Sequence, residues 1–164
     1  MRTMLARINE HAAEEVEVRG WVHRIRELGK ISFILLRDVS GMAQLVVDAG
    51  SGAGEVAQTA SRLTLESVIS ARGKVAENGK APGGFEVQVS ELEVIARAEP
   101  DLPVAVNQDP DKVSLDTILE HRMISLRNPK ILSVFRLQSS ILEHFAEHMR
   151  SEGFTEIKTS KLIG

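Results

Sequence analysis

Five cations lie close together near the start of the chain, and they are the first side chains that could do chemistry. Between positions 19 and 37 the sequence has one acid, Glu27, and a run of basic residues: Arg19, Arg24, Arg26, Lys30 and Arg37. Guanidinium and ammonium groups in one short segment can bind the phosphates of a nucleic acid. The plainer interpretation is that they are solvated side chains on strands, and charge alone leaves both open.

The charge of the whole chain narrows the kind of nucleic-acid binding to expect. The 164 residues sum to a net charge of -3 at pH 7, and the segment 99–120 is predominantly acidic. A protein that coats nucleic acid regardless of sequence needs a strongly basic surface. We therefore expect one local binding surface near the basic segment.

Residue patterns that would indicate an active site or a metal site are missing from these 164 residues. The absence of cysteine excludes a disulfide framework and a thiolate metal site. His144 and His148 lie four apart, but no carboxylate or thiolate motif accompanies them. No phosphate-binding glycine loop, Ser-His-Asp set or carboxylate pair stands out. The sequence therefore predicts no catalytic residue, no cofactor and no metal ion in this chain.

Composition and the N-terminus are those of an ordinary cytoplasmic protein. Hydrophobic residues make up 43% and charged residues 26%. No apolar run approaches the roughly 20 residues that span a bilayer. Residues 1–5 lack the apolar core and the small-residue cleavage site of a signal peptide. We expect a cytoplasmic location and no membrane partner.

A small β domain must position the basic residues. Five segments have strand character: 16–26, 31–38, 42–49, 68–75 and 85–95. Residues 54–63 carry Val56, Ala60 and Leu63 at helical spacing, and glycine-containing turns separate the strands. Residues 4–11 can form a short amphipathic helix with Leu5, Ile8 and Ala12 on the barrel side. The order β-β-β-α-β-β predicts a closed five-stranded OB-fold barrel whose second and third strands form an oligonucleotide platform.

The pattern changes after position 98. Residues 99–111 are rich in proline and acids, which predicts a hinge. Ser114 can cap a helix that runs to about Met123, and Asn128-Pro129 predicts a long second helix that ends at Gly153, followed by a strand over 154–159. Because no later element of this chain can cover the long helix, we expect further sequence or a partner to cover its apolar stripe: Ile131, Val134, Phe135, Leu137, Ile141, Leu142, Phe145 and Met149.

An ordered series of motifs then resembles one family over nearly the whole chain, the archaeal-type class II aspartyl-tRNA synthetases. The motifs are Val18-Arg19-Gly20-Trp21-Val22, Arg26-Glu27-Leu28-Gly29, Phe33, Leu36-Arg37-Asp38, Gly41, Gln44, Gly83-Gly84-Phe85-Glu86-Val87, Leu102-Pro103, Leu115-Asp116-Thr117, Arg122, Leu126-Arg127 and Glu152-Gly153-Phe154-Thr155-Glu156-Ile157-Lys158-Thr159.

The resemblance implies a mainly β protein with helices, in three parts. Residues 1–103 would be an OB-fold anticodon-binding domain, and 104–128 a hinge. Residues 129–164 would be the truncated start of an α+β catalytic domain, with class II motif 1 at its end. In similar enzymes motif 1 builds the dimer interface. Ser160 stands where motif 1 has a proline, which leaves the local geometry of that dimer interface open.

Four residues carry over as anticodon-binding residues. In similar proteins the phenylalanine at the position of Phe33 stacks on an anticodon base. Gln44, with an amide donor and acceptor, looks like the reader of the central uridine. Glu86 would accept a hydrogen bond from a base, and Arg26 would contact a base edge or a phosphate. The alternatives are a core aromatic at Phe33 and solvated strand residues at Glu86 and Arg26.

Four further positions complete the expected site. Arg24 and Lys30 are candidates for supporting phosphate contacts. His23 and Pro82 would flank the third anticodon base, where a His and a rigid Pro suggest relaxed recognition of both tRNA-Asp and tRNA-Asn. Strand alternation sets Trp21 apart from Arg24 and Arg26, so we interpret it as a packing residue.

For the full protein the resemblance implies aspartate–tRNA ligase activity, with ATP and Mg²⁺ bound by motifs 2 and 3. Those motifs are not among these 164 residues, so we expect this chain to be inactive alone. Motif 1 implies a homodimer. The alternatives are the corresponding region of an asparaginyl-tRNA synthetase and a stand-alone OB-fold RNA-binding module.

Overall fold

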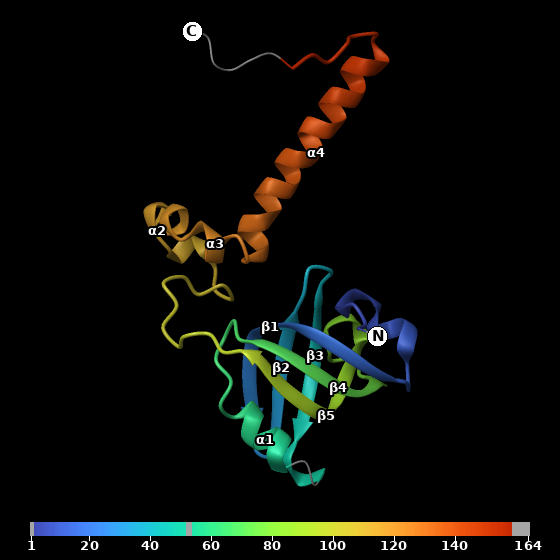
Figure 1. Ribbon diagram of the computed structural model, residues 1–164, viewed down its shortest axis with the longest axis vertical. Helices are drawn as coiled ribbons and strands as arrows, with labels where there is room; N and C mark the ends of the chain where they lie inside the picture. Colours follow the sequence, from blue (N-terminus) through green and yellow to red (C-terminus); the bar gives the residue numbers. More distant parts are fainter. Residues whose placement is uncertain (1, 52–53, 159–164) are drawn as a thin grey trace. The chain divides into compact units, whose positions relative to one another are not determined.

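The N-terminal part of the chain is a closed five-stranded barrel (Figure 1). The computed structural model describes residues 2–51 and 54–158. The strands follow one another around the barrel in the order β1-β2-β3-β5-β4. Their bounds are β1 (Glu15–Leu28), β2 (Ile31–Arg37), β3 (Met42–Asp48), β4 (Val68–Glu77) and β5 (Phe85–Ala96). The predicted five strands and the OB-fold are confirmed, with the first strand longer than expected.

Strand alternation builds the core of the barrel. Every second side chain points inward, and the fully buried ones are aliphatic: Val18, Val22, Ile34, Leu36, Leu45, Val47, Ile69 and Val87. Neighbouring strands are antiparallel except β3 and β5, which pair in parallel. A side chain at Gly20 would collide with the carbonyl of Arg37, so glycine permits β1 and β2 to approach closely there. The outward residues are left to form the surface.

Two short elements accompany the barrel. Helix α1 (Gly54–Ala60) lies between β3 and β4 and buries Ala60, which confirms a helix at this place but ends it three residues early. The expected N-terminal helix is the 3-10 helix η1 (Leu5–His11), which buries Leu5 and Ile8. Ala12 is exposed, so its predicted place against the barrel was wrong. The chain leaves the helix at Ala12 and reverses at Ala13, which has a positive φ of 64°.

Asp38, at the end of β2, fastens η1 to the barrel. Its carboxylate accepts hydrogen bonds from the backbone N–H of Leu5 at 3.1 Å, Ser40 at 2.7 Å and Gly41 at 3.0 Å. Burial alone would raise the pKa of Asp38, but the hydrogen bonds from Ser40, Leu5 and Gly41 outweigh it and hold that pKa below its usual value. The carboxylate therefore acts as the missing N-cap of η1 from 33 residues away.

In the second compact unit, Pro103–Gly164, the regular elements that the structure describes are all helices. It contains η4 (Pro110–Lys112), α2 (Leu115–Glu120), α3 (Arg122–Ser125) and α4 (Pro129–Ser151). Ser114 caps α2 as predicted, accepting a hydrogen bond from the N–H of Thr117 at 3.2 Å. The single helix expected up to Met123 is instead two, because the backbone at His121 leaves the helical region. The boundaries at 103 and 128 stay predictions.

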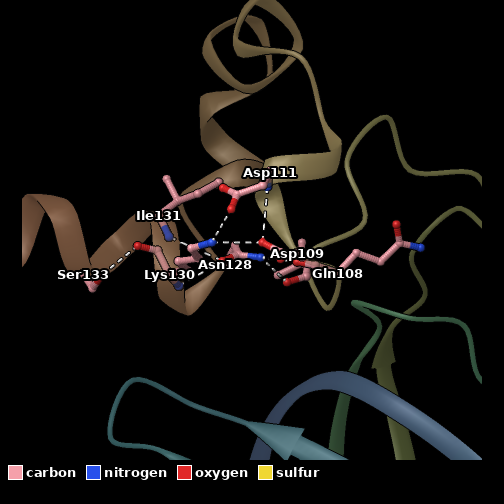
Figure 2. A network of polar contacts seen from close by, with 8 residues as sticks. Gln108, Asp109, Asp111, Asn128, Lys130, Ile131 and Ser133 are labelled. Atoms are coloured by element: carbon pink, nitrogen blue, oxygen red, sulfur yellow. Dashed lines mark hydrogen bonds and ion pairs between the residues drawn. The ribbon is translucent and has the colours of Figure 1, made fainter.

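Asn128 organises the start of α4, as Figure 2 shows. Its amide oxygen accepts a hydrogen bond from the N–H of Lys130 at 2.9 Å, and its amide nitrogen donates to the carbonyls of Val106 at 2.9 Å and Gln108 at 2.8 Å. The ammonium of Lys130 lies 3.1 Å from Asp109 and 2.8 Å from Asp111. The hydrogen bonds that the ammonium donates to Asp111 and Asp109 raise the pKa of Lys130, and the bond to Asp111 contributes most. The acidic segment is thus tied to the helix.

Helix α4 ends where the sequence predicted, with Gly153 at a φ of 86°. The predicted strand does not form over 154–158, and Thr159 and Ser160 lie outside the described residues. None of the described helices combines the length and the apolar character that crossing a bilayer requires. Much of the apolar stripe on α4 is exposed by 49 to 63%: Val134, Phe135, Leu137, Ile141, Leu142 and Phe145.

Candidate nucleic-acid interface

The strand register places the predicted anticodon-binding residues on one outer face of the barrel. One row across the sheet runs Arg24, Leu35, Gln44 and Glu86, and the next runs Arg26, Phe33, Val46 and Gln88. Directly paired residues project to the same side of a sheet. The alternate residues Ile34, Leu45 and Val87 fill the core. Four strands, β1, β2, β3 and β5, therefore carry one polar surface with an aromatic ring in it, which we call the reading face.

Arg26 and Phe33 form a pair on the reading face. The guanidinium carbon of Arg26 lies 5.2 Å from the centroid of the Phe33 ring, within the range of a cation–π contact. Phe33 is half-buried and is not among the residues that make up the core. The structure thus places this ring where a flat base can reach it, which argues against the core-aromatic alternative.

Gln44 and Glu86 meet across the parallel strands β3 and β5. The amide nitrogen of Gln44 donates to Oε2 of Glu86 at 2.9 Å, and the same oxygen accepts a hydrogen bond from the amide of Asn78 at 2.6 Å. Asn78 was not among the site residues predicted from the sequence. The signal that could have found it is its place one residue beyond β4 and two residues after Ala76, which pairs with Glu86.

The β4–β5 loop carries Pro82 as well as Asn78. Pro82 opens the short helix η3 (Pro82–Gly84) and is exposed, while Gly83 and Gly84 have positive φ values of 76° and 79°. The backbone N–H of Asn78 donates to the carbonyl of Gly84 at 2.9 Å and closes the loop. The loop is therefore attached to the strand that carries Glu86.

The five cations of the basic segment divide into two groups. Arg19 is paired with Glu17 at 2.6 Å, and Arg37 is buried against Glu66. Arg24, Arg26 and Lys30 are exposed and make no ion pair with the residues that the structure describes. Lys30 lies at the tight turn between β1 and β2, and the two arginines lie on β1. Only these three cations remain available for a phosphate.

His23 is not on the reading face. It lies at an irregularity of β1, between Val22 and Arg24, where the register against β2 shifts by one residue. Its side chain is buried, and its Nδ1 lies 2.9 Å from the guanidinium of Arg37. Arg37 in turn donates to Glu66 at 2.8 Å and stands over the ring of Trp21. The structure does not bring His23 together with Gln44 or Phe33, and its role in specificity stays a prediction.

Because His23 is buried, we expect the free energy of unfolding to depend on pH. Burial, followed by the charge of Arg37, lowers the pKa of His23 below the usual 6.5, against an opposing effect of Glu66. As the pH falls through 6.5 the unfolded chain takes up a proton that the folded chain resists, so the free energy of unfolding should decrease. The loss levels off below the folded-state pKa. In His23→Gln this part of the decrease should disappear, as measured by urea unfolding at pH 7.5 and 5.5.

The control for this prediction is His144→Gln, because His144 is exposed on α4. That variant should keep the wild-type dependence on pH. If His23→Gln also keeps it, the buried imidazole is not the source.

Comparison with known proteins identifies both units. Residues 16–95 match the OB-fold nucleic acid binding domain, and residues 114–164 match the tRNA synthetases class II (D, K and N). The aspartate–tRNA(Asp/Asn) ligase of Methanocaldococcus jannaschii is 43% identical over 157 residues, which are 94% of this chain and 35% of that protein. The chain spans about 35% of the length of the curated relatives it matches.

Solved structures of tRNA synthetases are also similar in fold to this chain. The asparaginyl-tRNA synthetase of Pyrococcus horikoshii has a TM-score of 0.83 at 28% identity, over 94% of this chain and 36% of that one. The aspartyl-tRNA synthetase of Entamoeba histolytica has a TM-score of 0.84 at 27% identity, over 99% of this chain and 40% of that one. With its OB-fold nucleic acid binding domain and its class II segment, the chain belongs to the class II tRNA synthetases (D, K and N), and it is similar in sequence to the aspartate–tRNA(Asp/Asn) ligases.

Proposed function

We propose that the reading face binds the anticodon loop of a tRNA and that the whole protein is an aspartate–tRNA ligase. The observation that carries the proposal is the Gln44–Glu86 pair, at 2.9 Å, on the same face as Phe33 and Arg26. Single-stranded bases are recognised by stacking on aromatic rings and by hydrogen bonds to their Watson–Crick edges. This face offers both, with cations beside them.

The predicted site residues then have the following roles. Phe33 stacks on a base, with Arg26 beside it to contact a base edge or a phosphate. Gln44 binds the Watson–Crick edge of the central uridine, and Glu86 accepts a hydrogen bond from a base N–H. Arg24 and Lys30 contact phosphates, which fix the register of the loop without reading sequence.

The reaction and its cofactors are proposed for the whole protein. Curated relatives are named aspartate–tRNA(Asp/Asn) ligases, and the reaction of this class joins aspartate to tRNA-Asp through ATP and Mg²⁺. Among the described residues no three His, Cys, Asp or Glu side chains gather to hold a metal ion, so we assign no residue of this chain to Mg²⁺ or ATP. A cytoplasmic location and a homodimer of the whole protein through motif 1 complete the proposal.

An asparaginyl enzyme is the second candidate, because a structure of that kind superposes with a TM-score of 0.83. Its identity of 28% is well below the 43% of an aspartate relative, which favours aspartate. A stand-alone RNA-binding module is disfavoured by the class II match over residues 114–164.

The test is titration of the 164-residue chain with anticodon stem-loops that differ at one base. Wild-type protein should prefer uridine over cytidine at the central position by on the order of ten-fold or more. Gln44→Ala should lose most of that preference. Equal binding of both stem-loops by wild type would overturn the proposal.

The same titration tests how strongly the protein selects the third anticodon base. If His23 and Pro82 leave that base weakly selected, stem-loops with cytidine and uridine at the third position should bind within about three-fold of each other, which is under 1 kcal/mol. A preference of ten-fold or more for cytidine would contradict use of tRNA-Asn.

A further inference from the structure

The orientation of the Gln44 amide decides which base it suits. A glutamine amide accepts a hydrogen bond at its oxygen and donates at its nitrogen, and a half-turn exchanges the two ends. With the oxygen opposite atom N3 of a pyrimidine, the amide suits uracil, whose N3–H donates. With the nitrogen there, it suits cytosine, whose N3 accepts. A glutamine free to turn would therefore separate the two bases poorly.

Glu86 holds the amide in one orientation. A carboxylate accepts hydrogen bonds and has none to donate, so the Gln44 nitrogen must face Glu86, at 2.9 Å from Oε2. The half-turn would set the amide oxygen against the carboxylate and lose a charge-assisted hydrogen bond. The Gln44 oxygen is consequently the end that remains for a base.

Asn78 holds the carboxylate in turn. Its amide nitrogen donates to the same Oε2 of Glu86 at 2.6 Å, the shorter of the two contacts. Asn78 is itself fixed by the loop, because its Oδ1 accepts from the N–H of Lys80 at 3.0 Å. Its backbone N–H donates to Gly84 and its carbonyl accepts from Ala81, both at 2.9 Å. The backbone bonds hold the residue in the loop, and turning the side chain away would break its hydrogen bonds with Lys80 and Glu86.

The other carboxylate oxygen is left for solvent or ligand. Both hydrogen bonds end on Oε2, and Oε1 of Glu86 receives none from the described residues. No buried side-chain oxygen or nitrogen in the described part of the chain lacks a partner, so Oε1 reaches the surface. Glu86 therefore positions Gln44 with one oxygen and presents the other.

We propose that Asn78 is a positioning residue for base selection. By fixing the Glu86 carboxylate it fixes the Gln44 amide, so that the Gln44 oxygen faces a base with an N–H donor and uracil is chosen over cytosine. This inference rests on the proposed anticodon-binding function.

Two substitutions separate this role from closure of the loop. Asn78→Ser keeps an oxygen that can accept from the N–H of Lys80, but its side chain is too short to reach Glu86. Asn78→Asp keeps both the size and the acceptor, and it sets a second carboxylate against Glu86 in place of the donor. The matched control is Gln58→Ser, which changes an exposed amide side chain on α1.

The measurement is the ratio of dissociation constants for stem-loops with cytidine and uridine at the central position. We expect a wild-type ratio on the order of ten to a hundred. Asn78→Ser should lower the ratio to about three or less, and Asn78→Asp at least as far. Gln58→Ser should keep the wild-type ratio. Thermal unfolding of each variant checks that the barrel remains folded.

The outcomes distinguish this inference from the function on which it rests. If Gln44→Ala abolishes the preference while both Asn78 variants keep it, the role of Asn78 is refuted and the anticodon-binding function stands. A fall in affinity for both stem-loops at an unchanged ratio also refutes it, since the loop would then act only by its shape. Absence of a preference in wild type overturns the function and this inference together.

Discussion

Replacing Arg37 by methionine should lower the free energy of unfolding by about 3 to 5 kcal/mol, the cost of leaving one member of a buried ion pair alone. The side chains of Arg37 and Glu66 are 10% and 4% exposed, and they meet at 2.8 Å. Methionine fills much of the volume but removes the donors that face Glu66 and His23. Urea unfolding followed by circular dichroism measures the loss.

Two controls test this explanation. The double variant Arg37→Met with Glu66→Gln should recover part of the loss, because it also removes the uncompensated charge. Arg24→Met changes an exposed arginine on the same sheet and should cost less than about 0.5 kcal/mol. If Arg37→Met costs no more than Arg24→Met, the buried ion pair does not hold β1, β2 and the segment before β4 together.

Replacing Phe33 by alanine should weaken binding of an anticodon stem-loop by on the order of ten- to a hundred-fold, because stacking of one base on an aromatic ring contributes about 1–3 kcal/mol. The loss should be similar for stem-loops with different central bases, since a ring stacks on any of them. Fluorescence anisotropy with a labelled stem-loop measures it.

Two further variants test whether stacking on the Phe33 ring, and not general apolar contact, explains the loss of binding. Phe33→Tyr keeps the ring and should bind within about three-fold of wild type. Leu35→Ala shortens a half-buried side chain on the neighbouring row of the same face. If Leu35→Ala weakens binding as much as Phe33→Ala, general apolar contact and not stacking explains the loss.

The barrel could be predicted from the sequence because its signal is local. Alternation of aliphatic and polar residues along segments such as 31–37 sets which side chains enter the core. Glycine at positions 29, 83 and 84 marks turns with positive φ. The cap at Asn128 was readable for the same reason, since the residue and the backbone N–H groups it serves are neighbours in sequence.

The features that escaped prediction depend on the register between paired strands. His23 is buried because β1 shifts its register between Val22 and Arg24, and no residue type near it signals an irregularity. Asn78 lies 2.6 Å from Glu86 because the antiparallel register of β4 and β5 brings the two side chains together. A strand was expected after Gly153, but a strand exists only beside a partner strand. Patterns along the chain do not contain that information.

The parallel pairing of β3 with β5 also sets an order of assembly. Arg26 and Phe33 sit on the hairpin of β1 and β2, which closes over a short loop, whereas Gln44 and Glu86 are 42 residues apart. Contacts between distant residues form late, since the entropy of closing a long loop must be met first. If the reading face binds RNA as proposed, stacking and phosphate contacts would depend on the local β1–β2 hairpin, whereas selectivity between bases would depend on the long-range pairing of β3 with β5.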